Sequence, residues 1–463
     1  MRDLTKGSIH KNFLIFSIPI IISSVLSSAF GVINTSIAGL FLGAKGLAAT
    51  SASSGYFSII YSVFFGFAYG MAVYMGNLFG AKDFVRLKKI MVTTFCMVIA
   101  ATLLVGGISV FLYRPVFAFL NVEEAIWDDS LKYYRLMCAH MCLAMLSHFF
   151  ITAANAIGET RFPLYMSVLS SALTIGGNFL AVGVFDFGVV GIGVSNLISA
   201  SVVCLLYTVR FYFYFREMGV HKIRVIPRFR YFTALLPFSI PNIVQQMSMY
   251  MGILLMSPVR NALGYAVMAA VSITSQIGGM CNTVYYASAK TSASYIAQCV
   301  GAKKYGKIKK AVGVAFLQGC MFFLPILFFI CFFPDVICGL FIDEANDPQT
   351  WEYAKMYIRY ILPFIVCNMV CGIFHSVFRG IKANKHLMIS ATVCTVAQVV
   401  VSYTATPAFG IMGLYAGTVA GWFFEAVYVL AVFFSGHWVP KKIRHLVLPN
   451  KKKTYTDMDA YLT

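Results

Sequence analysis

The chain alternates long apolar runs with short polar connections, and this pattern predicts membrane-spanning helices. Each run holds roughly 20 residues or more, the length that a helix needs to cross a bilayer. The runs lack the strict alternation of barrel strands, and a helix satisfies its own backbone hydrogen bonds in lipid. We therefore expect an all-α membrane protein with twelve transmembrane helices, near residues 13–42, 47–77, 89–113, 130–155, 162–185, 188–214, 232–258, 265–298, 310–334, 352–379, 386–407 and 410–435.

The second half of the chain repeats short sequence patterns of the first half. Phe16-Ser17-Ile18-Pro19 returns as Phe238-Ser239-Ile240-Pro241, and the first helix is expected to bend at its proline. Gly80-Ala81-Lys82 returns as Gly301-Ala302-Lys303 at nearly the same spacing. Matches that keep their order and spacing indicate a duplicated unit.

Six predicted helices fall in each half, so we expect two homologous six-helix lobes. The N-lobe is placed at 1–214, a cytoplasmic basic linker at 215–231, the C-lobe at 232–436 and a polar basic tail at 437–463. Because six spans return the chain to its starting side, the halves should be related by a pseudo-two-fold axis along the membrane normal. Two such lobes can open to either side of the membrane in turn, which is typical of a transporter.

Composition agrees with a lipid-embedded chain. Of 463 residues, 59% are hydrophobic and 11% are charged, whereas a soluble domain has roughly 25% charged residues. The net charge of +19 is best explained by basic loops against an anionic inner leaflet, so no nucleic-acid partner is expected. The odd-numbered connections hold only Lys45, Arg114 and Arg260. The positive-inside rule then places both termini in the cytoplasm of a multi-pass plasma (inner) membrane protein.

The residues that carry metal or catalytic chemistry do not form recognisable motifs. The 12 cysteines are scattered through apolar runs without CxxC pairs, so we expect no metal site and no disulfide framework. The sequence contains no Walker loop, HExxH or GxSxG motif. We therefore expect neither an enzyme nor a resident cofactor.

Several motifs together resemble the multidrug and toxic compound extrusion (MATE) transporters. They include Leu4-Thr5-Lys6-Gly7, Gly80-Ala81-Lys82-Asp83, Gly158-Glu159-Thr160-Arg161-Phe162-Pro163 and Asn178. The resemblance implies twelve helices in two lobes and export of cationic or amphipathic compounds against a Na⁺ or H⁺ gradient. The wider superfamily also includes flippases for lipid-linked saccharides, which remain the alternative.

The chain departs from the family pattern where ion coupling is expected. The resemblance implies an Asp in the first helix, where this sequence has Asn34. It also implies an Asp four residues after Asn178 in the fifth helix, where this sequence has Val182. The carboxylates that usually couple transport to an ion are therefore absent from these two positions.

A buried ionisable group in a membrane usually has a partner or a function. Glu425 is the one acid near the centre of a predicted helix. It is a candidate proton or cation site, a counter-charge for a cationic substrate, or a carboxylate that is hydrogen-bonded within its own lobe. Lys290 either pairs with Glu425, replaces a coupling cation, or extends to the cytoplasmic interface.

Four amides are further candidates for substrate or ion binding. Asn34 and Asn178 either line a polar site or bond two helices together. Gln245 and Gln246 follow Pro241 near an expected kink, where an amide could face a cavity.

These observations predict a secondary-active antiporter that exports small amphipathic, cationic compounds by alternating access. The coupling ion is expected to be H⁺ or Na⁺. The expected partners are a small-molecule substrate and the lipid bilayer, with the protein acting as a monomer. A flippase would instead require a strongly basic cavity to hold a pyrophosphate.

Overall fold

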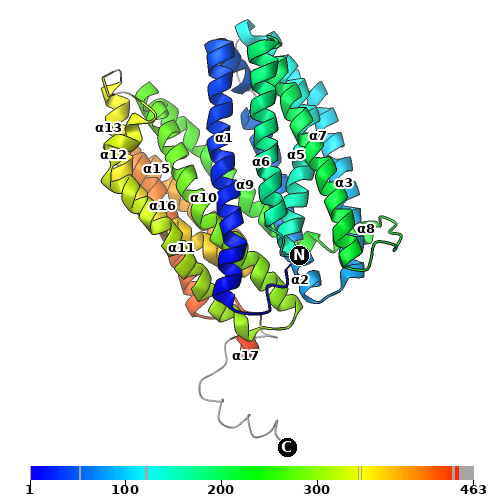
Figure 1. Cartoon of the computed structure of the whole chain (residues 1–463). Helices are drawn as coiled ribbons and strands as arrows, with labels where there is room; N and C mark the ends of the chain where they lie inside the picture. The colour runs from blue at the N-terminus through cyan, green and yellow to red at the C-terminus, as the bar shows by residue number, and fades with distance from the viewer. Residues whose placement is uncertain are drawn as a thin grey trace, which may run out of the picture. The chain divides into compact units, whose positions relative to one another are not determined.

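The computed structural model describes residues 2–51, 54–119, 124–342, 344–345, 347–440 and 444–447, and the regular elements in these ranges are all helices (Figure 1). Ten of the described helical segments are long and apolar enough to cross a bilayer. With α9 and α10, of 27 and 37 residues, they make up the twelve spans of the predicted all-α membrane fold. The long elements are α1 (Ile9–Ser51), α2 (Ser54–Gly80), α3 (Phe84–Phe111), α5 (Trp127–Ala156), α6 (Arg161–Asn178) with η2 (Phe179–Val184), α7 (Gly188–Glu217), α9 (Leu236–Ala262), α10 (Tyr265–Gly301), α11 (Gly306–Phe332), α13 (Pro348–Met356) with η3 (Tyr357–Ile361), η4 (Leu362–Phe364) and α14 (Ile365–Gly380), α15 (Asn384–Phe409) and α16 (Ile411–Phe434). The short helices are α4 (Tyr113–Phe119), η1 (Glu124–Ile126), α8 (Phe229–Thr233), α12 (Pro334–Gly339) and α17 (Arg444–Val447).

The first helix is interrupted later than the sequence suggested. Pro19 lies inside α1, and the residue whose backbone leaves the helical region is Gly43, with φ +64° and ψ −170°. Glycine tolerates this conformation because it has no Cβ. The first span therefore ends close to its expected limit at residue 42, and a further helical stretch follows to Ser51.

The chain forms two compact units that divide α1 and α9 internally. Unit 1 consists of Pro19–Ile243 with the first two residues, and unit 2 combines Asp3–Ile18 with the chain from Val244 onward. The lobes expected from the repeat, 1–214 and 232–436, have different limits and stay a prediction. Of the expected tail, residues 441–443 and 448–463 lie outside the described part of the chain.

Local contacts explain why the start of α9 belongs to unit 1 and the segment from Asp3 to the start of α1 belongs to unit 2. In unit 1, Gly66 and Gly70 of α2 leave no room for a Cβ against the α9 backbone at Ile243 and Ser239. The Ser239 hydroxyl also donates to the Phe67 carbonyl oxygen at 3.1 Å. Unit 2 holds the beginning of the chain in a similar way, because the Leu4 amide donates to Gln298 Oε1 at 2.9 Å.

Each unit has its own packed interior. In unit 1, α5 contacts α2, α3 and α7, and Phe150 stacks on Tyr207 with ring centroids 5.5 Å apart. In unit 2, α10 packs against α11, α13 and α14, while α15 lies along α16. Gly413 and Gly417 allow this close α15–α16 approach, since a Cβ at either position would collide with α15.

The duplication is visible in the backbone where helices end. Lys82, Gly158, Lys303 and Lys382 all have left-handed φ values, between +59° and +80°. Each donates its N–H to the carbonyl oxygen three residues back, and the next residue donates to the one five residues back. This is the Schellman arrangement that terminates a helix. Two of the four positions, Lys82 and Lys303, are the matched lysines of the sequence repeat.

Candidate functional site

In unit 1, Asn34 of α1 and Asn178 of α6 contact each other. Asn178 is fully buried, and its Nδ2 donates a hydrogen bond to Asn34 Oδ1. The remaining amide oxygen, Asn178 Oδ1, is buried and accepts no hydrogen bond within the described residues. The pair therefore presents neutral oxygen and nitrogen atoms and no titratable group.

The backbone changes its form directly after Asn178. The α-helix gives way there to the π-helical turn η2, a kind of irregularity that often accompanies functional sites. Val182, at the position of the absent acid, is 4% exposed and packs on Ile192. An apolar contact therefore occupies the position at which the resemblance implies a carboxylate.

In unit 2, four helices bring a set of buried polar side chains together. Gln245 of α9, His375 of α14 and Glu425 of α16 are 3%, 7% and 6% exposed. Gln245 Nε2 lies 2.9 Å from His375 Nδ1, and His375 Nε2 lies 3.3 Å from Glu425 Oε1. Ser390 of α15 adds its hydroxyl at 2.8 Å from His375 Nε2. Arg379, one turn after His375, donates to Gln245 Oε1 at 2.6 Å.

The hydrogen bonds fix the direction of donation along this network. Because the Arg379 guanidinium can only donate, it orients the Gln245 amide with its oxygen toward Arg379 and its NH₂ toward His375. His375 Nδ1 must then accept, so Nε2 carries the imidazole proton. The Ser390 hydroxyl donates to the Leu387 carbonyl oxygen at 3.0 Å, which leaves its oxygen free to accept from Nε2. A neutral His375 therefore donates toward Ser390 and the Glu425 carboxylate.

Two thiols complete the surroundings of Glu425. Cys371 of α14 and Cys394 of α15 lie near its carboxyl group. A thiol is only a weak hydrogen-bond donor, so these two side chains stabilise the carboxylate less than hydroxyl or amide donors would. Protonation of Glu425 would remove its charge and one of its acceptor atoms, and this would weaken the contact with His375.

Lys290 and Gln246 belong to neither network. Lys290 of α10 is partly exposed and makes no hydrogen bond or ion pair among the described residues. Of the three alternatives for Lys290, the pair with Glu425 is not formed among the described residues, where His375 contacts that carboxylate. Gln246 follows Gln245 in α9 and is partly exposed. Because successive residues of a helix point about 100° apart, Gln246 does not share the direction in which Gln245 faces the network.

His375 and Arg379 were missed by the sequence reasoning. They stand four residues apart in Ile365–Gly380, so they share one face of α14. A histidine and an arginine on one face of an otherwise apolar span are a signal of a polar network. That signal was available, although it does not reveal which helix supplies the partner.

The family model described as MatE matches residues 19–180 and 237–404. The probable multidrug resistance protein YoeA of Bacillus subtilis is 21% identical over 351 residues, covering 74% of this chain and 75% of that protein. The probable multidrug resistance protein YpnP of the same organism is 22% identical over 368 residues, with coverages of 80% and 82%.

Solved structures share the fold at low sequence identity. A mutant of the Vibrio cholerae MATE transporter VcmN matches with a TM-score of 0.85 and 16% identity, covering 93% of this chain and 98% of that one. A transporter of the MOP superfamily from Pyrococcus furiosus matches with a TM-score of 0.83 and 19% identity, with coverages of 96% and 98%. The family model covers both halves of the repeat, and the chain therefore belongs to the MatE family of multi-pass membrane transporters.

Proposed function

We propose that this protein is a secondary-active antiporter that exports small amphipathic, cationic compounds in exchange for protons. The observation that carries the proposal is the buried contact between Glu425 and His375 within unit 2. Bacillus relatives named as probable multidrug resistance proteins support the substrate class. The distribution of lysine and arginine supports cytoplasmic positions for both termini. That the protein acts as a monomer in the plasma membrane stays a prediction.

The geometry around Glu425 supports a proton as the coupling ion. An antiporter needs a site whose charge or occupancy differs between its inward and outward states. A deprotonated Glu425 accepts from His375 and provides a negative charge for a cationic substrate. A protonated Glu425 loses that charge, so proton binding and substrate binding oppose each other. Arg379 and Gln245 act as positioning residues, because they hold His375 in the tautomer that faces the carboxylate.

Asn34 and Asn178 support a different coupling ion, Na⁺, as the second candidate. Their amide oxygens are neutral, and Na⁺ prefers oxygen ligands. Asn178 Oδ1 is the buried oxygen that lacks a hydrogen-bond donor in the described structure. Under this candidate the Glu425 network is a structural contact within unit 2 and export follows the Na⁺ gradient.

A flippase for lipid-linked saccharides is less well supported. Such a protein needs several cations to hold a pyrophosphate. In the unit 2 network the cationic side chain is Arg379, and its guanidinium already donates a hydrogen bond to Gln245. A negatively charged Glu425 beside it would also repel an anionic substrate.

The test measures ethidium export from cells with the pH and Na⁺ gradients collapsed in turn. Glu425→Gln should abolish the dependence on the pH gradient while ethidium still binds. Asn34→Ala should keep that dependence, and the exposed carboxylate variant Glu217→Gln serves as the matched control. Surface expression is measured for each variant. Normal pH-driven export by Glu425→Gln, or loss of Na⁺-driven export in Asn34→Ala, would contradict the proton assignment.

A further inference from the structure

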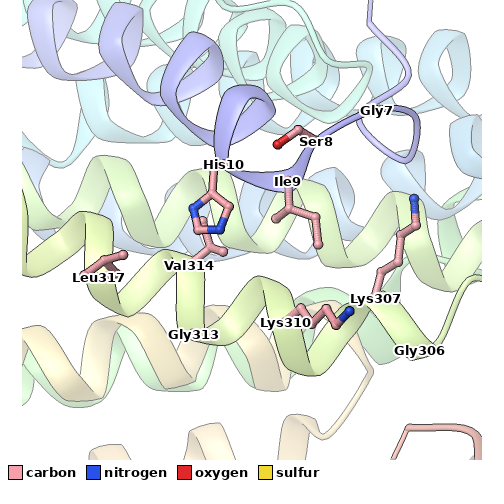
Figure 2. A pocket seen from close by; sticks show the side chains of 10 residues that line it. All are labelled: Gly7, Ser8, Ile9, His10, Gly306, Lys307, Lys310, Gly313, Val314 and Leu317. Atoms are coloured by element: carbon pink, nitrogen blue, oxygen red, sulfur yellow. The ribbon is translucent and has the colours of Figure 1, made fainter.

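A pocket of about 580 Å³ lies in unit 2 where α1 and α11 begin (Figure 2). Ile9 and His10 of α1 line one side, and Lys307, Lys310, Val314 and Leu317 of α11 line the other. Figure 2 shows the basic side chains toward the start of α11 and the apolar ones further along it. The pocket therefore has a cationic end and an apolar end, and the network around Glu425 does not use it.

The cationic end has no acidic side chain among its lining residues. Lys307 Nζ donates to the Thr5 carbonyl oxygen at 2.9 Å, so the N-terminal segment holds it in place. Lys310 is exposed and forms no ion pair or hydrogen bond with any described residue. The N-terminal end of α11, a helix of 27 residues, adds a favourable potential for an anion. The cationic end of the pocket is therefore lined by Lys310, which has no acidic partner among the described residues, and by Lys307, which the Thr5 carbonyl oxygen holds in place.

The apolar end continues into an exposed stripe along α11. Leu317 is 61% exposed, and Met321, Leu324 and Phe328 follow on the same face at helical spacing. In a helix that crosses a bilayer, such a face is in contact with acyl chains. A ligand whose anionic group fits the lysines could extend its hydrocarbon along this stripe without leaving the protein surface.

We propose that this pocket binds the headgroup of an anionic phospholipid. Lys310 and Lys307 hold the phosphate, and one acyl chain runs over Val314 and Leu317, past His10, onto the stripe of α11. Free phosphate would use the cationic end alone and would gain nothing from the apolar end. Basic pockets at the cytoplasmic ends of membrane helices suit this class of lipid. Because Lys307 also holds Thr5, the bound lipid would lie against the segment that begins the chain.

The test compares lipid binding by the purified full chain and single variants, using native mass spectrometry with phosphatidylglycerol or phosphatidylcholine. Lys310→Gln should weaken phosphatidylglycerol binding about fivefold, the effect of one lysine near an anionic surface. Lys309→Gln is the matched control, because Lys309 is exposed on α11 but does not line the pocket; its binding should stay within about twofold. Leu317→Ser should weaken phosphatidylglycerol binding and leave the thermal unfolding temperature unchanged.

Three results would overturn the proposal. Equal losses in Lys309→Gln and Lys310→Gln would mean diffuse attraction to the basic surface. Equal binding of phosphatidylglycerol and phosphatidylcholine would remove the role of the charge. Displacement of the lipid by millimolar inorganic phosphate, with no effect of Leu317→Ser, would identify a free-anion site instead.

Discussion

At the scale of single residues, the buried polar groups of this chain are organised by directional hydrogen bonds. Arg379 donates to Gln245, Gln245 donates to His375, and His375 donates toward Glu425 and Ser390. Each member satisfies its neighbour, which offsets the cost of placing polar groups away from water. A substitution in the middle of the chain of bonds should therefore affect more than one partner.

The substitution His375→Ala tests whether these side chains form one connected network, because His375 contacts three of the other members. The substitution leaves the Gln245 NH₂ and the Glu425 carboxylate without their shared partner, so the free energy of unfolding should fall by about 1–3 kcal/mol. A reversible unfolding titration in mixed micelles measures the change. His437→Ala is the control, because His437 is exposed and its imidazole contacts the nearby Ser435 hydroxyl at 2.7 Å; its effect should stay within about 0.5 kcal/mol. Equal losses in the two variants would argue against a connected network.

The sequence identified part of this network. Glu425 stands out because an acid in a long apolar run is expensive and therefore informative. Gln245 could be singled out by its position after Pro241. The pairing with His375 could not be predicted, because it depends on how α9, α14 and α16 are rotated about their own axes. For the same reason the charge of Lys290 could not decide whether it pairs with Glu425.

At the scale of helices, the ends and interruptions depend on the backbone conformation of single residues. Gly43 ends the first span with a positive φ, and Gly158 takes a left-handed turn where a Cβ would collide with the Arg2 carbonyl. Lys82 and Lys303 make the same turn with a side chain present, both at φ +59°. A lysine in this conformation is strained relative to glycine, so these two turns carry a cost that glycine would remove.

Lys82→Gly should therefore stabilise the protein by about 1 kcal/mol. The gain comes from relief of the contact between Cβ and the backbone in the left-handed region. Lys82→Ala removes the same charge but keeps the Cβ, and it should give no stabilisation. Thermal unfolding of both variants in the same detergent compares them directly. A gain in Lys82→Ala equal to that in Lys82→Gly would assign the effect to charge.

The π-helical turns were not predictable from apolar patterning. η2 begins after Asn178, and η3 interrupts the span Pro348–Gly380 that continues into α14. The sequence of η2 is apolar throughout, and that of η3 is apolar except for Arg359, so neither segment is distinguished by its pattern from an uninterrupted helix. The extra backbone residue in such a turn shifts the face that later residues present, and this placement depends on packing within each unit.

At the scale of the whole molecule, the long apolar runs predicted a multi-pass helical membrane protein, and the fold confirms it. The duplicated motifs predicted two equivalent halves, and the shared Schellman turns repeat that pattern in the backbone. Sequence repeats could not predict that α1 and α9 each belong to both compact units. That division depends on close contacts such as those of Gly66 and Gly70 with the start of α9.

The orientation in the membrane is a prediction of the charge distribution. Single cysteines at Arg224 and Glu344 should behave oppositely toward a membrane-impermeant maleimide added to intact cells. The Glu344→Cys variant should be labelled, and Arg224→Cys should be labelled only after permeabilisation. The unsubstituted chain gives the background from its native cysteines. Labelling of Arg224→Cys in intact cells would reverse the assigned topology.

The central claim is that proton binding at Glu425 opposes binding of a cationic substrate. The most direct measurement is proton release when ethidium is added to the purified protein in weakly buffered solution, followed with a pH indicator. The unaltered chain should release about one proton for each ethidium bound at a pH where Glu425 is protonated, and Glu425→Gln should bind ethidium without release. Equal proton release by the Glu425→Gln variant, or binding without release in the unaltered chain, would contradict the account.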